Sequence, residues 1–482
     1  MLFNTLHFAL FLSIVFLIYW CVVNKGFKLQ NIVLLLASYF FYACWDWRFL
    51  FLLIFSTFLD FFTGLRMDKS NNQRTKKFWF WICIVINLGF LGLFKYYNFF
   101  INSLSEVLLK NGIQMDLFTL NVILPVGISF YTFHGLSYVI DIYKNKIKAE
   151  KSFFDYSVFV CFFPLLVAGP IERATHLLPQ LKKNRIFNRE NAIDGLRQIL
   201  WGLFKKVVIA DNCAHFANII FDNSSCYSGS TLVIGALLFT FQIYGDFSGY
   251  SDIAIGTARL FGIDLIRNFA FPYFSRDIAE FWRRWHISLS SWFRDYLYIP
   301  LGGSHGSIVK KIRNILIIFL ISGFWHGANW TFIIWGLLNA LFIMPSIIFK
   351  TNRNNLEIVA KGKLFASFKE IIQMVITFML IVFAWIFFRC SSVSHAFEFV
   401  SGVFSQSLFS MPDSKIFTLS KPLFLLIIIF IMIEWIGREQ SYGIEKLFFN
   451  RAPFLRWMFY YLLIIVIFLF AGSNQQFIYF QF

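Results

Sequence analysis

The sequence contains few charged residues. Asp, Glu, Lys and Arg together make up 14% of its 482 residues, whereas about 25% is typical of a soluble domain. Hydrophobic residues account for 58% of the chain and aromatic residues for 21%. This composition excludes an ordinary soluble protein, because many windows reach the ~20 apolar residues that cross the hydrocarbon core of a bilayer. The sequence therefore predicts a polytopic membrane protein.

Motifs that bind metals or nucleotides are also lacking. The seven Cys are scattered, with no C-x-x-C pair and no Cys/His cluster at the spacing of a zinc site. Their odd number argues against a complete disulfide framework, and we interpret them as small buried hydrophobes. The chain contains no Walker A motif and no glycine-rich dinucleotide fingerprint. We expect no metal site and no bound cofactor.

Acidic residues are outnumbered by basic residues, 26 against 43, which gives a net charge of +17. In a soluble protein this excess would suggest nucleic acid as a partner. Here the basic residues gather in short connections between apolar runs, and nothing resembles a nucleic-acid module. The pattern indicates loops that face the anionic lipid of the cytoplasmic leaflet. Membrane lipid is the expected partner, and nucleic acid is not.

Alternate loops differ in basic content, and this difference predicts the topology. The basic set includes 66–77 and 350–363, whereas 223–229 and 473–482 contain no Lys or Arg. The positive-inside rule then predicts about twelve crossings, with both termini outside the cytoplasm. The predicted spans are 7–23, 30–46, 49–65, 78–96, 119–142, 193–221, 230–260, 312–325, 329–349, 369–388, 422–437 and 457–472. We expect a single membrane domain over 1–482.

Two regions do not fit a simple crossing. Segment 153–171 is apolar, but it has basic flanks and contains Pro164 and Pro170, which break helices. A re-entrant hairpin accommodates it where protein or a water-filled cavity surrounds the irregular backbone. Segment 276–298 predicts an amphipathic helix that lies in the membrane interface, with Ser275 as its N-cap. An ordinary peripheral anchor is the alternative interpretation of that helix.

The stretch SGFWHGANW, residues 322–330, places one titratable side chain in apolar sequence. The predicted span before it, 312–325, has about 14 residues, which is too short to cross alone at 1.5 Å per residue. Gly323 and Gly327 allow the helix to break around His326. An ionisable residue at that depth is a functional candidate, because imidazole exchanges protons near neutral pH. A packing histidine bonded to a neighbouring carbonyl is the alternative.

A second polar patch lies in YGDFSGYSD, residues 244–252. It contains Tyr244 and two carboxylates, Asp246 and Asp252, inside an apolar span. A charge at the bilayer centre costs roughly 3 kcal/mol on insertion scales. The patch therefore indicates a cavity lining, a donor site or a cation site, or equally a structural hydrogen-bond network.

Several ordered motifs resemble one known family. The stretches FWRRWHISLSSWFRDYLYIPLGG (281–303) and SGFWHGANWTFIIWG (322–336) are similar to the membrane-bound O-acyltransferase (MBOAT) family. Three further stretches, LPVGISFYTFHGLSYVIDIY, AGPIER and YGDFSGYSDIAIG, precede them in the order found in the bacterial alginate O-acetyltransferase branch. The resemblance covers nearly the whole chain, from the MLFN start onward.

The resemblance implies an all-α bundle of spanning helices around a tunnel or funnel, with re-entrant pieces. The catalytic histidine of the family, in its W-H-G motif, falls on His326, and a second characteristic histidine falls on His286. The implied donor is cytoplasmic acetyl-CoA or a comparable thioester. The implied acceptor is an exported glycan, reached through a separate periplasmic partner of the SGNH type. Relatives acetylate alginate, peptidoglycan, cellulose or other exopolysaccharides, and a related branch transfers D-alanine toward teichoic acid.

These expectations combine into one functional hypothesis. His326 acts as general base on the acceptor hydroxyl, and His286 orients or polarises the thioester. The candidate residues for binding substrate or donor are Trp325, Asn329, Asp246, Tyr244, Trp285, Arg283 and Arg294. The arginines are expected to attract donor phosphates, with contacts to lipid headgroups as the alternative.

The expected location is the inner membrane of a bacterial cell. A transporter or flippase is the rival from another class, with Asp246 and Asp252 as coupling sites and no covalent transfer. A scaffold subunit of an envelope complex is a third possibility, and its role would not depend on His326.

Overall fold

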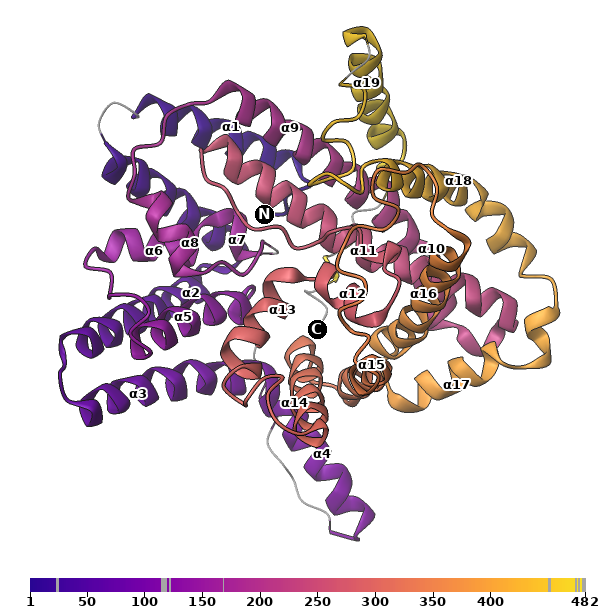
Figure 1. The fold of residues 1–482 in the computed structure, drawn as a ribbon, viewed down its shortest axis with the longest axis horizontal. Helices are drawn as coiled ribbons and strands as arrows, with labels where there is room; N and C mark the ends of the chain where they lie inside the picture. Colours follow the sequence, from indigo (N-terminus) through magenta and orange to yellow (C-terminus); the bar gives the residue numbers. More distant parts are fainter. Residues whose placement is uncertain are drawn as a thin grey trace. The chain divides into compact units, whose positions relative to one another are not determined.

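The chain is all-helical in the part that the structure describes. A computed structural model defines residues 1–22, 26–113, 119–120, 123–167, 169–449, 452–472, 475 and 477–478. Within these ranges there is no β-strand (Figure 1). The helices fall into two compact units, unit 1 (Met1–Ala192 and Thr257–Ile266) and unit 2 (Ile193–Gly256 and Arg267–Phe482). The expectation of a single domain stays a prediction.

Several helices have the length and composition of membrane spans. Among the described residues six qualify, namely Phe27–Lys69, Gln73–Lys110, Gly229–Leu260, Trp330–Ile348, Phe368–Arg389 and Ser414–Ile436. Two shorter apolar helices, Leu6–Cys21 and Pro453–Leu469, add to them. Large apolar side chains cover their surfaces; Leu36, for example, is 63% exposed. The polytopic, all-α character is confirmed, and the count of twelve crossings stays a prediction.

Unit 1 begins with long helices and continues with short ones. Its helices are α1 (Leu6–Cys21), α2 (Phe27–Lys69), α3 (Gln73–Leu91), the π-helix η2 (Gly92–Tyr96), α4 (Tyr97–Lys110), α5 (Ile128–Tyr143), α6 (Phe153–Cys161), α7 (Phe163–Leu166) and α8 (Ala174–Leu181). α2 kinks at Asp46, where the backbone is extended. The kink falls at the boundary of the expected spans 30–46 and 49–65, so the two helical segments of α2 correspond to these two spans.

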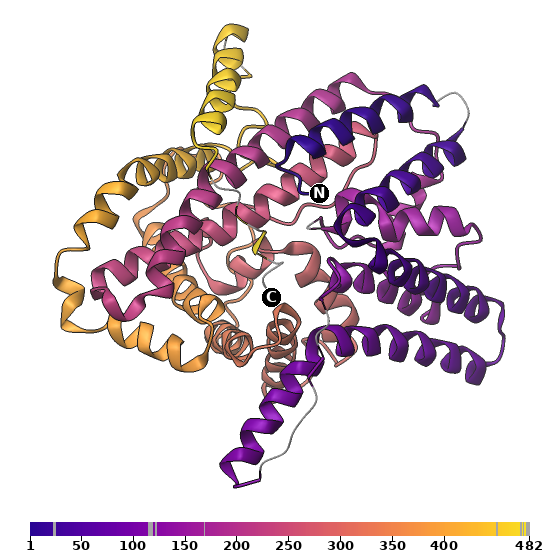
Figure 2. The same cartoon turned by 180° about the vertical axis from the view of Figure 1, so that it is seen from behind.

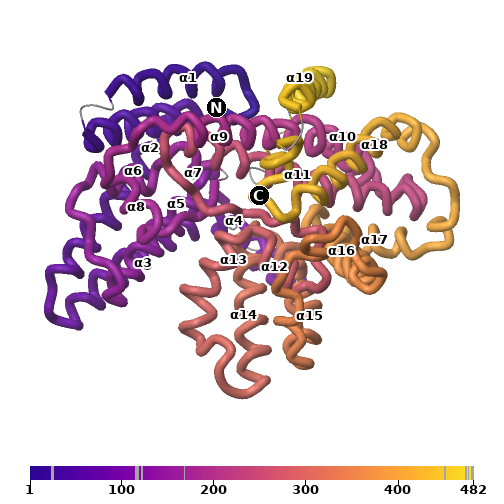
Figure 3. Tube along the Cα trace, turned by 45° about the horizontal axis from the view of Figure 1, so that its top comes forward, coloured from indigo at the N-terminus to yellow at the C-terminus, as the bar shows by residue number. Residues whose placement is uncertain are grey.

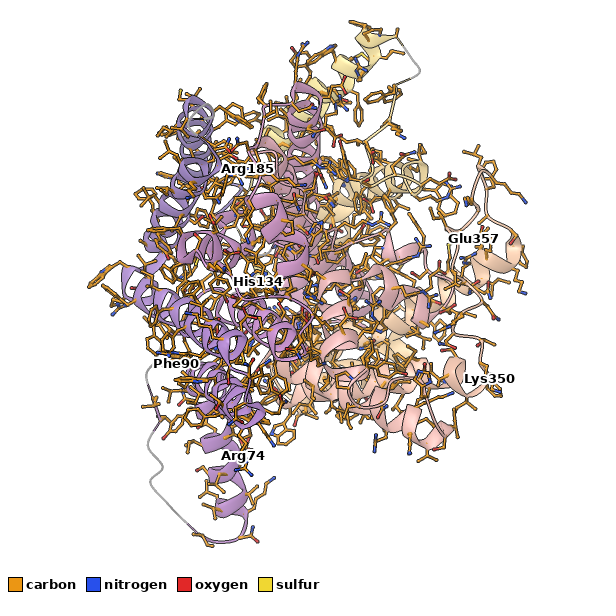
Figure 4. All side chains as sticks on the ribbon, turned by 60° about the vertical axis from the view of Figure 1, so that its left-hand side comes forward. Arg74, Phe90, His134, Arg185, Lys350 and Glu357 are labelled. Atoms are coloured by element: carbon orange, nitrogen blue, oxygen red, sulfur yellow. The ribbon has the colours of Figure 1, made fainter. Side chains whose placement is uncertain are left out.

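Close backbone approach and buried polar side chains hold unit 1 together. α2, α3 and α5 lie side by side (Figure 1, and from behind in Figure 2). A methyl group on Gly135 of α5 would lie 1.9 Å from a carboxylate oxygen of Asp60 in α2, so only glycine fits there. The buried Arg185, labelled in Figure 4, donates to the side-chain oxygen of Asn31 at 2.6 Å. These contacts tie the loop after α8 to α2.

The apolar segment 153–171 consists of short helices in unit 1. α6 ends at Cys161, and α7 starts with Phe163 and has Pro164 in its first turn. Most of the segment is buried. His134 of α5, labelled in Figure 4, accepts the N–H of Glu172 at 3.0 Å, directly after this segment. The predicted helix breaks are thus present, and the position of the segment in the bilayer stays a prediction.

Unit 2 carries the motifs that include the two histidines. Its helices are α9 (Arg189–Leu203, which starts in unit 1), η3 (Phe204–Ala210), α10 (Asp211–Asp222), η4 (Ser224–Cys226), α11 (Gly229–Leu260), η5 (Pro272–Phe274), α12 (Ile278–Arg284), α13 (Ile287–Phe293), η6 (Arg294–Tyr298), α14 (Ile308–His326), α15 (Trp330–Ile348), α16 (Phe368–Arg389), α17 (Val393–Val403), η7 (Gln406–Phe409), α18 (Ser414–Ile436) and α19 (Pro453–Leu469).

The helix before His326 is longer than expected. α14 runs from Ile308 to His326, 19 residues, and does not break at Gly323. It packs along α15 as a helical hairpin (Figure 3). The prediction of a 14-residue span was wrong because hydropathy alone excludes the basic first turns of the helix. The break follows His326, where Gly327 is extended at φ −164°.

Segment 276–298 is not one amphipathic helix. α12 ends at Arg284, and α13 starts after His286, whose backbone is left-handed at φ 43°. The N-cap is Asp277, whose carboxylate accepts the Glu280 N–H at 2.7 Å, and not Ser275. Helical spacing of the aromatic residues suggested continuity, but the turn at His286 redirects the second half of the segment.

The Cys are free thiols throughout the described residues. Cys83, Cys161, Cys213 and Cys390 are buried, as expected of small hydrophobes, whereas Cys21, Cys44 and Cys226 are exposed. The interpretation of all seven as buried residues was therefore wrong for these three.

Candidate active site

A cavity of about 380 Å³ lies within unit 2 beside α12, α13 and α14. Its lining comprises Ala279, Trp282, Arg283, Trp285, His286, Ile287, Leu289, Ser290, Ser291, Phe293, Arg294, Tyr298, Ile318, Phe319, Ser322, His326, Ile343 and Asn352. Both predicted catalytic histidines line it, although 40 positions separate them in the sequence. No Asp or Glu occurs among these described lining residues, so no carboxylate opposes the charge of the two lining arginines.

His326 is enclosed by aromatic rings at the end of α14. Its own exposed fraction is 4%. The ring centroid lies 4.9 Å from that of Trp325, 5.1 Å from that of Trp335 and 5.3 Å from that of Phe388, all in edge-to-face geometry. The three rings restrict the rotation of the imidazole and exclude water from all but its cavity side. Trp325 is therefore part of the aromatic enclosure of His326.

His286 is held in an unfavourable state that points to function. A left-handed backbone is uncommon for a residue with a side chain, and here φ is 43°. The imidazole is 1% exposed, and neither ring nitrogen has a hydrogen-bond partner in the described part of the chain. Burial lowers the pKa of His286 to about 3, so the ring is neutral near pH 7. Strain and unsatisfied buried nitrogens at one residue are typical of sites that await a ligand.

Aromatic side chains connect the two histidines. Trp325 contacts His286 as well as His326, with a centroid distance of 6.1 Å to the former. Trp285 is buried and lines the cavity next to His286. Its ring stacks on that of Phe281, with 5.5 Å between the ring centroids. Trp285 and Trp325 are thus structural parts of the cavity. Their affinity for substrate stays a prediction.

Both predicted arginines line the cavity. Arg283 donates to the backbone carbonyls of Asn352 at 2.9 Å and Asn355 at 2.8 Å, which leaves its charge without a carboxylate partner at those distances. Arg294 pairs with Asp295 at 2.8 Å, and its side chain is 62% exposed. The cavity is therefore basic at these residues and apolar toward the histidines.

Sequence reasoning missed the hydroxyl groups of the cavity. Ser290, Ser291 and Ser322 line it together with the histidines. The Ser291 hydroxyl donates to the carbonyl of Ser288 at 3.0 Å. Only the helical spacing within SLSSWF indicated them, and serine at a cavity wall carries no distinctive sequence signal.

Asn329 does not line the cavity. Its side-chain oxygen accepts the N–H of Thr331 at 3.0 Å, which makes it the N-cap of α15. Its amide donates to the carbonyl of Ser391 at 2.8 Å. Asn329 thus fixes the loop that follows His326 onto the segment before α17, and it orients His326 only indirectly.

Asp246 and Tyr244 belong to two buried clusters, neither of which lines this cavity. Lys206 of η3 bridges Asp246 and Asp211, at 2.7 Å to each. The backbone N–H of Ile478 donates to the second oxygen of Asp246 at 2.7 Å. The hydroxyl of Tyr244 donates to Glu434 of α18. None of these residues lines the cavity with the histidines.

The second predicted carboxylate, Asp252, has buried partners of its own. Asp252 pairs with Lys205 at 2.6 Å and accepts from Gln198 at 2.8 Å. The structural interpretation of YGDFSGYSD is therefore the one that the contacts favour. Sequence reasoning missed Lys205 and Lys206, although two adjacent lysines inside the apolar range 193–221 were a visible signal.

No group of His, Cys, Asp and Glu side chains within the described ranges has the arrangement of a metal site. The described lining of the cavity offers imidazole, hydroxyl and guanidinium groups.

Comparison with known proteins agrees with this geometry. Residues 144–393 match the model of the MBOAT, membrane-bound O-acyltransferase family. The matched range includes both histidines and the whole cavity lining. The chain belongs to the membrane-bound O-acyltransferase family. It is accordingly a multi-pass membrane O-acyltransferase, and the resemblance inferred from the motifs is confirmed.

Individual relatives of this acyltransferase differ in their acceptors. A protein of Pseudomonas aeruginosa named probable alginate O-acetylase AlgI is 37% identical over 421 residues, 87% of this chain and 78% of the relative. The peptidoglycan O-acetyltransferase of Helicobacter pylori is 35% identical over 530 residues, 100% of this chain and 98% of the relative. The teichoic acid D-alanyltransferase of Bacillus subtilis is 27% identical and matches 57% of this chain and 71% of the relative.

Proposed function

We propose that this protein moves an acetyl group from a cytoplasmic thioester, acetyl-CoA, to a hydroxyl of a glycan of the bacterial envelope. The observation that carries the proposal is the joint lining of one cavity by His326 and His286. Acetyl is the expected acyl group, because two of the relatives above are named for O-acetyl transfer. The expected membrane is the bacterial inner membrane, where cytoplasmic donor and exported glycan are separated by one bilayer.

In the proposed reaction His326 is the general base. It takes the proton of the acceptor hydroxyl as the oxygen attacks the thioester carbonyl. A neutral His286 donates its N–H to the oxygen that becomes negative, the role of an oxyanion hole. The carbon–sulfur bond then breaks, and the thiolate takes the proton back from His326. The products are an O-acetyl ester and a free thiol.

The charge pattern of the cavity supports a donor entering at its arginines. Arg283 and Arg294 are suited to attract the phosphates of the donor, while Trp282, Ile318 and Phe319 form apolar walls toward the histidines. The acceptor hydroxyl belongs either to the glycan itself or to a serine of a periplasmic SGNH-type partner that completes the transfer.

An exopolysaccharide of the alginate kind is the first candidate acceptor. Peptidoglycan is the second, and it is favoured by the relative that matches this chain along its full length. D-alanyl transfer finds less support, because its relative matches little more than half of the chain. The acceptor is best identified by comparing O-acetyl release from both glycans in strains with and without the protein.

The decisive experiment uses the purified full chain in lipid nanodiscs with radiolabelled acetyl-CoA. We expect the wild type to release CoA and to transfer label to added glycan or partner, and His326→Ala to do neither. His215→Ala is the matched control, since His215 is exposed and does not line the cavity. Full transfer by His326→Ala at a normal level in the membrane contradicts the assignment. In sealed proteoliposomes, label that enters the lumen without a covalent bond to an acceptor would support a transporter instead.

A further inference from the structure

A second cavity of unit 2 is polar and carries excess positive charge. Its volume is about 310 Å³, and it shares no lining residue with the cavity of the histidines. Its charged lining residues are Arg267, Arg284, Arg438, Lys446, Glu439 and Glu445. With four cations and two anions the pocket has a formal charge of +2. The charged residues fall in 266–313 and 438–451, connections between predicted spans that contain several Lys and Arg and that the positive-inside rule assigns to the cytoplasm.

The two carboxylates of this pocket accept hydrogen bonds from backbone N–H groups. Glu439 accepts the N–H of Gly362 at 2.7 Å, and Glu445 accepts the N–H of Ser441 at 2.6 Å. Neither forms an ion pair with a pocket arginine within the described part of the chain. The acids thus shape the loops, and they leave the cations only partly compensated.

Arg438 is a buried cation that is held in place without a carboxylate. Its side chain donates to the carbonyls of Val359 at 3.0 Å and Ala360 at 2.7 Å, and its guanidinium lies 4.2 Å from the ring centre of Trp435. Burial lowers the pKa of Arg438, and Glu439 and Glu370 oppose the shift. Carbonyl oxygens satisfy its donors, but its charge is not neutralised by them.

Arg267 is the pocket cation with no partner of its own. Across the described ranges, no hydrogen bond or ion pair holds its guanidinium, whereas Arg284 pairs with Glu280 at 2.8 Å. Desolvation and then the charge of Arg284 lower the pKa of Arg267, and Glu445 acts in the opposite direction. Two arginines thus face one pocket, and an anion between them would relieve their repulsion.

We propose that this pocket binds a phosphate group. A phosphate fits because it accepts paired hydrogen bonds from a guanidinium fork and carries the charge that the site lacks. The phosphate belongs either to a soluble phosphorylated ligand or to the headgroup of an anionic lipid of the cytoplasmic leaflet. Both sources present the same chemistry to Arg267 and Arg284.

The position of Arg284 gives such binding a consequence for the catalytic cavity. Arg284 ends α12, and its backbone carbonyl accepts the N–H of Ala270 at 3.0 Å, beside the pocket. On the same short helix, Trp282 and Arg283 line the catalytic cavity, and the strained His286 follows two positions later. A phosphate on Arg284 would therefore fix α12 and, through it, His286.

The test compares the purified full chain with two variants by thermal unfolding followed through tryptophan fluorescence. One arm titrates inorganic pyrophosphate in neutral detergent. The other compares nanodiscs of phosphatidylcholine alone with nanodiscs that contain phosphatidylglycerol. Arg267→Gln removes the unpaired cation, and Arg353→Gln is the matched control, since Arg353 is exposed and lines neither cavity.

We expect a saturable rise in the melting temperature of the wild type, since a ligand of the folded state stabilises it. Arg267→Gln should weaken binding about tenfold, as for loss of one charged hydrogen bond, and Arg353→Gln should bind as well as the wild type. Arg267→Lys keeps the charge but loses the guanidinium fork, so its affinity should lie between those of Arg267→Gln and the wild type. A response in the pyrophosphate arm assigns a soluble ligand, and a response to phosphatidylglycerol alone assigns a lipid.

No saturable response in either arm, or equal losses in Arg267→Gln and Arg353→Gln, would overturn the proposal. The His326→Ala variant separates this inference from the proposed function. It should keep the full response to the anion because the two cavities share no residue. A lack of acetyl transfer therefore does not contradict the phosphate site. A lack of phosphate binding likewise does not contradict the proposed acetyl transfer.

Discussion

Gly323 of α14 lies against the backbone of Phe332 in α15, so that a methyl group on Gly323 would be 2.2 Å from the Phe332 carbonyl oxygen. Gly336 makes the reciprocal contact, with 2.3 Å between its hypothetical methyl and the carbonyl oxygen of Phe319. Small residues let helix backbones approach in membranes, where packing drives association. This contact lies one turn before His326 and fixes the end of α14 on α15.

Substitution of Gly323 should displace His326 without removing any side chain that lines the cavity. Gly323→Ala overpacks the crossing, which costs roughly 1–3 kcal/mol and displaces His326. We expect a lower melting temperature and a large loss of acetyl transfer at equal protein level. Gly89→Ala is the control, since nothing lies within 4 Å of its added methyl. Normal transfer by Gly323→Ala would show that the close contact does not position His326.

His286 should tolerate Asn better than Ala. Asn adopts the left-handed backbone more readily than most residues and keeps an N–H donor. His286→Ala loses the donor, and we expect transfer to fall by about 10²–10³, the range for one oxyanion-hole donor. His286→Asn should retain a measurable part of the wild-type transfer activity. In both variants we expect the loss mainly in kcat, with a smaller change in KM. Equal activity of the Ala variant and the wild type would exclude a donor role.

Loss of Lys206 should destabilise unit 2. The Lys206 ammonium is 1% exposed and pairs with Asp211 and Asp246. Removing one partner of a buried ion pair costs about 3–5 kcal/mol, because the remaining charge is uncompensated. Lys206→Met should therefore unfold at a lower temperature, and Asp246→Asn in the same chain should restore part of the loss. Lys415→Met, at an exposed position, should be neutral; an equal loss there would refute the argument.

The pair of His176 and Glu172 in unit 1 predicts a dependence of stability on pH. Glu172 accepts from His176 at 2.8 Å and raises the pKa of this histidine, against the effect of desolvation. A raised folded-state pKa contributes stability that is complete below the unfolded value near 6.5 and is lost as pH rises through the folded value. The effect is small, because the His176 side chain is 42% exposed.

The test of this pair compares melting temperatures at pH 6 and pH 9. His176→Gln should lower the melting temperature at pH 6 and have little effect at pH 9. The exposed His305 provides the control, since His305→Gln should give no difference that depends on pH. A constant difference for His176→Gln across this range would show that packing, and not charge, explains its effect.

Much of the fold was predictable because hydropathy is a local property of the chain. Apolar runs indicated the membrane helices, and the kink of α2 at Asp46 falls between two predicted spans. Predictions failed where a helix boundary is polar or a turn is set by distant contacts. α14 begins in a basic segment that hydropathy excludes, and the amphipathic pattern of 276–298 gave no sign of the left-handed turn at His286.

The sequence by itself determined the membrane character, the family and the two histidines, since each depends on composition or on a local motif. Tertiary structure decided which side chains share a cavity. It placed His326 and His286 together, and it assigned Asp246 to Lys206 and Asn329 to the start of α15. The physical reason is that an isolated charge or imidazole in an apolar run looks the same whether it meets a ligand or a buried partner. Only the packing of distant segments distinguishes the two.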